Sequence, residues 1–554
     1  MKNFKSIAAI LLAAALVLLP ACRKSFDISD DKIDTAEPST IDPTNAEDEV
    51  TNFTGEYVME VVYSGGSATW TLTDSLGTEV STPDSLSISV SGAGVTVNNE
   101  GSYTVKYVLS GSSSAGFFKL YSQRRQEIEL SDLSLTGSNG AAINNQSDKR
   151  TYRVLSGRNT IKDGGTYGTT LLSDGTAEDC RSAFFSEGQL CISGTGSVDI
   201  SASVADGKGG LFSDDYIRFL GGTVSVTASK GHAIRGKDAV ILSDGSVTAI
   251  CSADGKKAVT TDGLFQQDGG SLTASTTGAT VYDSEEKDQD RPTALKCDGD
   301  FVMNGGSLTA KANGSGGKGI KCSANIKIKG GYIFASSTTH EGFTCDGTWT
   351  QDGGVVIAEA YDDAVNSAKV LTVNDGCLRG TSTNNDGIDA NAAIYINGGV
   401  VIGEGKSSPE CGIDSVEGTT VTVSGGFVVS RGGGLNSFTS SGGVAFVQTT
   451  TTAGACYGLM SGSTPLMAYE APSSGGTTTM FCAPGIKSGS SYTLYTGVSV
   501  NLASEDFPRF GESFSGGSSG SSLSATSSIS DSMGGGGGPG GGGPGGGGPG
   551  GWGH

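Results

Sequence analysis

The sequence has little positive charge, and its N-terminal apolar run is short. It contains 36 Lys and Arg residues against 58 Asp and Glu residues, which gives a formal net charge of -22. So acidic a surface excludes nucleic acid as a partner, and it repels anionic polymers unless a cation intervenes. The apolar run of residues 7–19 follows Lys2 and Lys5 and is too short for a comfortable membrane span.

The start of the chain has the pattern of a lipoprotein signal peptide. Residues 19–22 read Leu-Pro-Ala-Cys and match a lipobox, so Cys22 is expected to become the lipid-modified N-terminus of the mature chain. A simple secretory signal that is cut elsewhere is the alternative. Residue 23 is Arg rather than Asp, which favours the outer membrane of a Gram-negative cell. The predicted location is the outer membrane or the cell surface, with the lipid anchor in the membrane.

Composition divides the chain into five predicted segments. Residues 1–22 are the signal peptide with the lipidated Cys, and residues 23–51 are an acidic, disordered tether because they are poor in apolar residues. Residues 52–440 are a parallel β-helix with an N-terminal cap. Residues 441–505 are a C-terminal β segment that packs on the helix, and residues 506–554 are a disordered Ser/Gly/Pro tail. The protein is expected to be a monomer.

Glycine is abundant, with 89 residues, and it recurs at regular intervals between short apolar runs. Nine turn pairs from Gly221-Gly222 to Gly425-Gly426 are spaced by about 22 to 27 residues, apart from one longer gap. Apolar residues occupy fixed positions around each pair, as a strand with one buried face requires. The apolar position that lies two residues after each pair is occupied by Val224, Val247, Leu272, Leu308, Ile333, Val356, Leu378, Val401 and Val428. The apolar position that lies four residues before each pair is occupied by Ile217, Val240, Phe265, Phe301, Ile326, Trp349, Leu371, Ile394 and Val421.

Each coil carries a third short run, such as Gly-Ile-Asp-Ala at residues 387–390. Three strands per coil, stacked roughly 4.8 Å apart, form a prism of three parallel sheets. The predicted fold class is therefore all-β, a right-handed single-stranded parallel β-helix of the pectate-lyase-like type. The alternative, an antiparallel sandwich, requires hairpin registers rather than one repeating phase through nine coils.

The coils resemble bacterial extracellular proteins described as carbohydrate-binding domain-containing, typified by a calcium-binding β-helix that binds cellulose and pectic polygalacturonate. The resemblance spans most of residues 85–500. It rests on Asp-Gly-Ile-Asp-Ala-Asn at 386–391 with Ile-Tyr-Ile-Asn-Gly-Gly at 394–399, and on Ser-Gly-Ser-Ser-Tyr-Thr-Leu-Tyr-Thr-Gly at 488–497. It implies polysaccharide binding without known catalysis.

Acidic and amide side chains fall at equivalent positions of successive coils. Carboxylates stacked about 5 Å apart repel one another, and calcium, which takes six to eight oxygen ligands, relieves that repulsion. An under-filled calcium site would also accept a uronate carboxylate. The alternative is a solvated acidic edge in which Asn and Asp serve the turns. The predicted calcium ligands are Glu341, Asp362, Asp363, Asn366, Asp386, Asp389 and Asp414, and Glu410 is expected in the same row as Glu341, Asp363 and Asp386.

In coils nearer the N-terminus, the outward position equivalent to that of Asp389 and Asp414 holds basic residues. Arg235, Lys296 and Lys321 form a strip that would bind a polyuronate directly, and the alternative is ordinary surface charge. Tyr332 and Phe334 begin an outward apolar patch that would stack sugar rings, unless residues 444–500 cover it. These five residues are the predicted carbohydrate-binding residues.

Three classes of function follow: a non-catalytic polysaccharide binder, a pectin lyase or hydrolase, and a structural surface protein or adhesin. Catalysis is disfavoured because Asp362-Asp363 and Arg235-Gly236-Lys237, which superficially echo polygalacturonase signatures, lie about five coils, roughly 25 Å, apart. His232 and His340 also lack the expected context. The sequence favours a binder of acidic plant-type glycans such as polygalacturonate, or of cellulose, with bound calcium.

Overall fold

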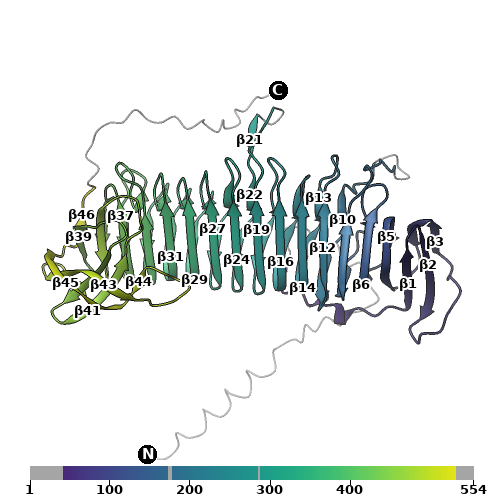
Figure 1. Cartoon of the computed structure of the whole chain (residues 1–554). Coiled ribbons are helices and arrows are strands. Elements are labelled where there is room, and N and C mark those ends of the chain that lie inside the picture. Colours follow the sequence, from purple (N-terminus) through teal and green to yellow (C-terminus); the bar gives the residue numbers. More distant parts are fainter. Residues whose placement is uncertain (1–41, 172–176, 285–286, 532–554) are drawn as a thin grey trace, which may run out of the picture. The chain divides into compact units, whose positions relative to one another are not determined.

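The computed structural model describes residues 42–171, 177–284 and 287–531. Cys22, the proposed lipidation site, and residues 23–41 and 532–554 lie outside the described residues. Figure 1 shows stacked coils followed by a C-terminal group of strands. The described part is a parallel β-solenoid of about 13 turns, which confirms the predicted all-β, parallel fold. Its helices are two 3-10 turns, η3 (Ala46–Asp48) and η4 (Val50–Asn52), and neither is long and apolar enough to cross a membrane.

Three parallel sheets run along the solenoid. Sheet I contains β7 (Ile143–Asn145), β10 (Ser182–Ser186), β13 (Gly209–Ser213), β15 (His232–Gly236), β17 (Val259–Thr261), β22 (Thr293–Cys297), β25 (Lys318–Cys322), β28 (Phe343–Cys345), β30 (Val365–Ser367), β32 (Ile388–Ala390) and β35 (Ile413–Ser415). Sheet II contains β8 (Thr151–Ser156), β11 (Leu190–Gly194), β18 (Leu264–Gln267), β23 (Phe301–Met303), β26 (Ile326–Ile328), β33 (Ile394–Ile396), β36 (Val421–Val423) and β38 (Phe438–Ser440). Sheet III contains β9 (Arg158–Lys162), β12 (Ser197–Ala202), β19 (Ser271–Thr276), β24 (Ser307–Ala312), β27 (Tyr332–Ser337), β34 (Val400–Glu404) and β37 (Phe427–Gly432).

Some strands are long enough to belong to two sheets, with a bend between their halves. These strands, shared by sheets II and III, are β6 (Gln126–Gly137), β14 (Tyr216–Ala228), β16 (Ala239–Cys251), β29 (Trp349–Ala360) and β31 (Leu371–Ser382). A small antiparallel hairpin, β20 (Val281–Asp283) with β21 (Asp288–Asp290), fills the one long gap between turn pairs and projects from the coils (Figure 1).

The repeating apolar positions stack in register, as predicted. In sheet II, Ile217 pairs with Val240 and the line continues through Phe265 to Val421. In sheet III, Val224 pairs with Val247 and the line continues to Val428. The members of both lines are almost fully buried, so each coil adds one layer to a continuous core. The parallel registers exclude the antiparallel sandwich.

The glycine turns follow from backbone geometry. The glycine at the second position of the turn pairs, for example Gly376 with φ +87°, adopts the left-handed conformation that side chains disfavour. A Cβ at Gly376 would also lie 2.6 Å from the carbonyl carbon of Gly353 in the preceding coil. Glycine is therefore required both for the conformation and for the close approach of the coils.

The N-terminal end of the solenoid is covered by antiparallel strands. They are β1 (Tyr57–Ser64), β2 (Ser67–Asp74), β3 (Leu86–Ser91) and β4 (Ala93–Asn99), and β1 and β4 join the coils through parallel pairing with β5 (Val105–Ser122). Residues 42–51, assigned to the tether from sequence, instead pack on the solenoid. The Asp48 carboxylate is fully buried and forms ion pairs with Arg150 (3.1 Å) and Arg218 (2.9 Å). These arginines supply the partners that make burial of an acidic segment favourable.

The C-terminal strands end the solenoid and cover part of sheet III. β42 (Thr478–Cys482) pairs antiparallel with β37 and with β39 (Phe446–Thr450), and β46 (Ser528–Ile529) pairs with β38. A five-stranded sheet contains β40 (Cys456–Ser461), β41 (Thr464–Glu470), β43 (Ser491–Asn501), β44 (Phe510–Gly511) and β45 (Ser513–Ser524). Residues 513–524, assigned to a disordered tail from sequence, form β45 because their backbone completes the edge of β43.

Candidate functional site

A line of polar residues runs along the outer face of sheet I, and we call it the polar column. Its neighbours along the chain, such as Ile320 and Ile388, point into the core. Strand pairing places its members in one register about 4.8 Å apart, as the sequence predicted for its cationic and acidic residues. The polar column contains Arg235, Thr260, Lys296, Lys321, Thr344, Asn366, Asp389 and Asp414. Its charge therefore changes from positive to negative along the solenoid.

Each cation of the polar column has an acidic neighbour. Arg235 Nη2 lies 2.7 Å from Asp262, Lys296 Nζ lies 2.8 Å from Asp298, and Lys321 pairs with Asp346. The three basic side chains keep between a fifth and a third of their surface exposed. Ion pairs this exposed contribute little to stability, so the cations can exchange their partners for the carboxylates of a ligand.

The predicted aromatic residues lie elsewhere. Tyr332 and Phe334 project from sheet III, where they pack against the apolar cluster of the C-terminal strands that includes Tyr457 and Phe481. The alternative that residues 444–500 cover this patch is the arrangement observed. The five predicted carbohydrate-binding residues therefore do not form one surface, because the C-terminal sheet uses the apolar patch as its own packing face.

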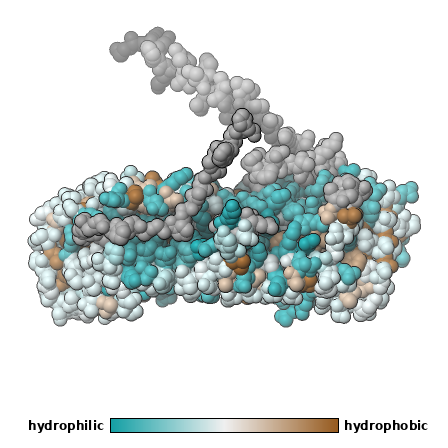
Figure 2. Space-filling model, turned by 90° about the horizontal axis from the view of Figure 1, so that it is seen from above, coloured by the Kyte–Doolittle hydropathy of each residue, from teal (hydrophilic) through white to brown (hydrophobic). Residues whose placement is uncertain are grey.

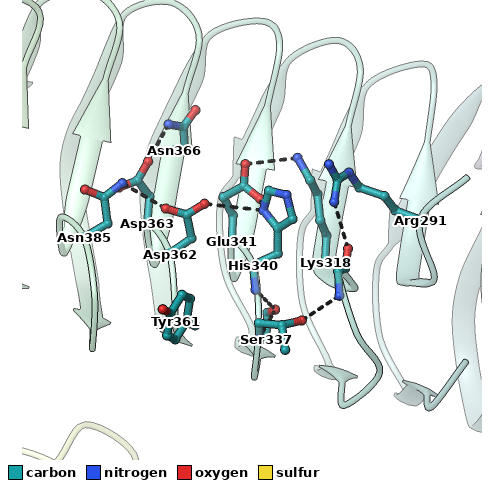
Figure 3. A network of polar contacts seen from close by, with 12 residues as sticks. Arg291, Lys318, Ser337, His340, Glu341, Tyr361, Asp362, Asp363, Asn366 and Asn385 are labelled. Atoms are coloured by element: carbon teal, nitrogen blue, oxygen red, sulfur yellow. Dashed lines mark hydrogen bonds and ion pairs between the residues drawn. The ribbon is translucent and has the colours of Figure 1, made fainter. Parts of the chain in front are cut away.

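Five of the seven predicted calcium ligands lie in two clusters, and the other two, Asp363 and Asn366, form hydrogen bonds to the second cluster. The first cluster contains His340, Glu341 and Asp362, which each offer one ligand atom within 4.8 Å of the others. Figure 3 shows these side chains on adjacent coils. His340 Nδ1 contacts Glu341 and lies 3.5 Å from Asp362 Oδ2. Lys318 Nζ donates to Glu341 Oε1 over 3.0 Å, and Asn385 donates to Asp362 Oδ1 over 2.9 Å.

Burial changes the ionisation of this first cluster. Desolvation, with the nearby Lys318, lowers the pKa of His340 to about 4, so the imidazole is neutral at pH 7. Desolvation, with the nearby Lys321 and Arg291, lowers the pKa of Lys318 to about 8. Figure 3 shows Arg291 on the far side of Lys318 from Glu341. The ammonium group of Lys318 therefore already supplies one positive charge to the carboxylates of this cluster.

The second cluster contains Asp386, Asp389 and Asp414, whose ligand oxygens also lie within 4.8 Å of one another. Asn366 Nδ2 donates to Asp389 Oδ2 over 2.9 Å and to Asp363 Oδ2 over 3.0 Å, so it links this cluster to the preceding coil. The backbone N–H of Cys411 donates to Asp386. No basic side chain forms an ion pair with the three carboxylates within the described ranges.

Without a basic partner among the described residues, the carboxyl groups of the second cluster resist ionisation. Burial, then the neighbouring Asp414, raises the pKa of Asp386 to about 9. Burial, then Asp363, raises the pKa of Asp389 to about 8, and burial also raises the pKa of Asp414. Desolvated carboxylates this close together require a proton or a cation to neutralise them.

Two features of the site escaped the sequence prediction. Glu410 does not share the row of Glu341, Asp363 and Asp386, because the backbone of Cys411 occupies that position. His340 has no predicted role from its sequence context, yet it turns toward Glu341 and Asp362. Its place directly before Glu341 in the acidic row was the available signal.

The comparisons with known proteins agree with the resemblance seen in the coils. Residues 91–263 match the family model described as carbohydrate-binding domain-containing protein, so this part of the chain is similar to that family. The match lies upstream of the motifs at 386–399 and 488–497. No curated protein matches the chain. A solved structure of a polysaccharide lyase-like protein from C. thermocellum, in a gadolinium derivative, is 14% identical and covers 58% of this chain and 99% of its own, with a TM-score of 0.30.

Proposed function

We propose that the protein is a non-catalytic extracellular binder of acidic polysaccharides, such as polygalacturonate, that uses bound calcium. The family match of residues 91–263 supports carbohydrate binding. The observation that carries the finer proposal is the polar column, in which Arg235, Lys296 and Lys321 are in register with Asp389 and Asp414. A polyuronate laid along sheet I meets cations directly at one end and carboxylates that need a bridging cation at the other.

The second cluster fits calcium better than the first. Its donors are carboxylate oxygens of Asp386, Asp389 and Asp414, close enough to share one ion, and calcium binds oxygen ligands at about 2.3 to 2.6 Å. Three ligands leave coordination positions open for water and for a sugar carboxylate. The first cluster already has Lys318 as a counter-ion and offers an imidazole nitrogen, which calcium does not favour.

The location follows the signal-peptide pattern. We propose that Cys22 carries the lipid and that the protein is held at the outer membrane or cell surface. Polysaccharides are accessible there, and residues 23–41 lie between the lipid and the first described residue. Metabolic labelling with a fatty acid analogue tests this: a Cys22→Ser variant should not be labelled and should not fractionate with membranes.

A pull-down on polygalacturonate tests the proposed function. The protein should be retained in calcium and mostly released by a chelator, and Asp386→Asn with Asp389→Asn should abolish the calcium-dependent part. The matched control is Asp199→Asn, an exposed carboxylate on the outer face of β12 in sheet III. Equal retention of the double variant and the control in calcium contradicts the assignment of the site.

A specific observation supports a second candidate function, a polysaccharide lyase. Lys318 has its pKa lowered to about 8, near the value of an effective general base, and it lies beside the carboxylate of Glu341. Elimination from a uronate produces unsaturated oligouronides that absorb ultraviolet light. Their release from polygalacturonate by the native chain, and not by Lys318→Ala, would establish the lyase instead of the binder.

A further inference from the structure

The coils on the N-terminal side of Lys296 form a pocket that is separate from the proposed calcium site. Its volume is about 560 Å³, and it lies over β13 and β15, between the loops that lead into sheet I on three successive coils. Phe212 and Arg235 line it, and these two residues are direct partners in the register of sheet I. The pocket is therefore a continuation of the polar column toward the N-terminus.

The lining of this pocket is basic in a protein that is strongly acidic. Four cationic side chains, those of Lys208, Lys230, Arg235 and Lys256, line it with one carboxylate, that of Asp254. Figure 2 shows that hydrophilic residues gather over the middle of the solenoid on the face seen there. A concave surface with this excess of positive charge concentrates anions.

Three of the four cations of the pocket form internal ion pairs, including Arg235 with Asp262 at 2.7 Å, but each of the three keeps between 29% and 47% of its side chain exposed, and ion pairs this exposed are weak. Lys208 pairs with Asp179 while about half of the lysine side chain stays exposed, and Lys256 lies 3.6 Å from Asp290. Lys230 is exposed and forms no ion pair in the part of the chain that the structure describes. An incoming carboxylate would therefore find charge that is only weakly compensated.

Besides the basic side chains, the pocket contains a hydrogen-bond donor with a fixed direction, the imidazole of His232. Its Nδ1 accepts a hydrogen bond of 2.9 Å from the backbone N–H of Lys257, so the proton of the neutral ring is on Nε2. Its ring stacks on Phe212 with the centroids 6.4 Å apart, which fixes its orientation. Burial, then Lys257, lowers the pKa of His232 to about 3, so the ring stays neutral. The imidazole can donate to a ligand oxygen over the whole physiological pH range.

We propose that this pocket is a calcium-independent binding site for a carboxylate-bearing sugar residue, with Arg235, Lys230 and Lys256 neutralising the carboxylate and His232 donating to a sugar or carboxylate oxygen. The inference rests on the proposed function and deepens it. Arg235 and Asp389 are six strand positions apart, about 29 Å at 4.8 Å per strand. A short acidic oligosaccharide can reach the pocket but not both sites, whereas a polymer can span them.

Calorimetry on the full chain tests the site with galacturonate trimer as the probe, in the presence of a chelator. The trimer should bind, its uncharged methyl ester should bind at least tenfold more weakly, and Lys230→Glu with Lys256→Glu should abolish binding. A single Arg235→Gln should weaken binding about tenfold, because the carboxylate loses one charged hydrogen-bond donor and keeps the two lysines. The control Lys327→Glu changes an exposed lysine on the outer face of β26 in sheet II and should bind as the native chain does.

The outcomes separate this inference from the proposed function. If the trimer does not bind in chelator while the polymer binds in calcium, the pocket site is overturned and the proposed function stands. Equal binding of the acid and its ester, or of the double variant and the Lys327→Glu control, also overturns the pocket. If neither trimer nor polymer binds under any condition, both proposals fail. Circular dichroism of each variant should match the native spectrum, because the substituted lysines are on the surface.

Discussion

At the scale of single residues, the second cluster couples ionisation to stability. In the unfolded chain an Asp carboxyl has a pKa of about 3.9, whereas the folded chain raises the pKa of Asp386 to about 9 and that of Asp389 to about 8. The calcium-free folded state thus binds more protons than the unfolded state. The contribution of these groups to stability is complete below about pH 4 and is lost as the pH rises through about 8 to 9.

We therefore expect the thermal unfolding midpoint, measured by circular dichroism in a chelator, to fall between about pH 5 and about pH 9. Saturating calcium should remove most of this fall, because the ion replaces the protons. The double substitution Asp386→Asn with Asp389→Asn should raise the midpoint at about pH 8 without calcium and should remove the response to calcium. The same pH dependence in the double variant and the native chain would contradict this account.

At the scale of elements, the turns that follow strands of sheet II depend on glycine for two separable reasons. Gly376 has φ +87° and contacts the preceding coil, whereas Gly443 has φ +84° and open space where a Cβ would lie. Gly443→Ala should cost about 1 to 2 kcal/mol from its backbone conformation alone. Gly376→Ala should cost a further 1 to 3 kcal/mol, roughly, from steric overlap. Urea denaturation of the two variants measures the difference, and equal midpoints would contradict it.

The elements that repeat could be predicted from the sequence, and those that break the repeat could not. Val247, Trp349 and Ile394 lie where they were predicted because strand alternation and glycine spacing fix the phase of each coil. The prediction for Glu410 was wrong because, in the longer coil between Gly399 and Gly426, Glu410 is four residues before Asp414, whereas Asp386 is three residues before Asp389. Cys411 therefore takes the place in the row.

Contacts between distant segments also left no periodic signal. Asp48 meets Arg218 across a sequence separation of 170 residues, and neither residue stands out in its local pattern. The same holds for His340, whose side-chain direction depends on how the loop before β28 bends. The line of the polar column was predictable, whereas the division of the acidic residues into two clusters depends on such local contacts.

At the scale of the whole molecule, the C-terminal sheet acts as a cover for an apolar surface. Phe481 of β42 is nearly fully buried and packs with Ile357, Ile402 and Val429 of sheet III. Phe481→Asp should detach this cover and expose the patch, which we expect to be seen as binding of a hydrophobic dye and as self-association in light scattering. The control Gln448→Asp lies on the exposed side of β39 and should change neither.

The upstream coils should remain folded in the Phe481→Asp variant. Each coil of a solenoid contacts only its neighbours, so damage at one end need not spread. Native-state hydrogen exchange should show faster exchange in β39 to β43 and unchanged protection in β10 to β16. Uniform loss of protection along the chain would contradict this separation.

The burial of Asp48 determines where mechanical load enters the solenoid. Any pull applied through the residues before Asp42 first meets the buried carboxylate and its two arginines, one directly before β8 and one in β14, and not the capping strands β1 to β4. The cap, whose strands contribute Met59, Val61 and Val95 to the main core, is thereby shielded from tension. A protein tethered at one end and gripping a long polymer along its side would transmit force through its stacked coils, where many parallel hydrogen bonds share it.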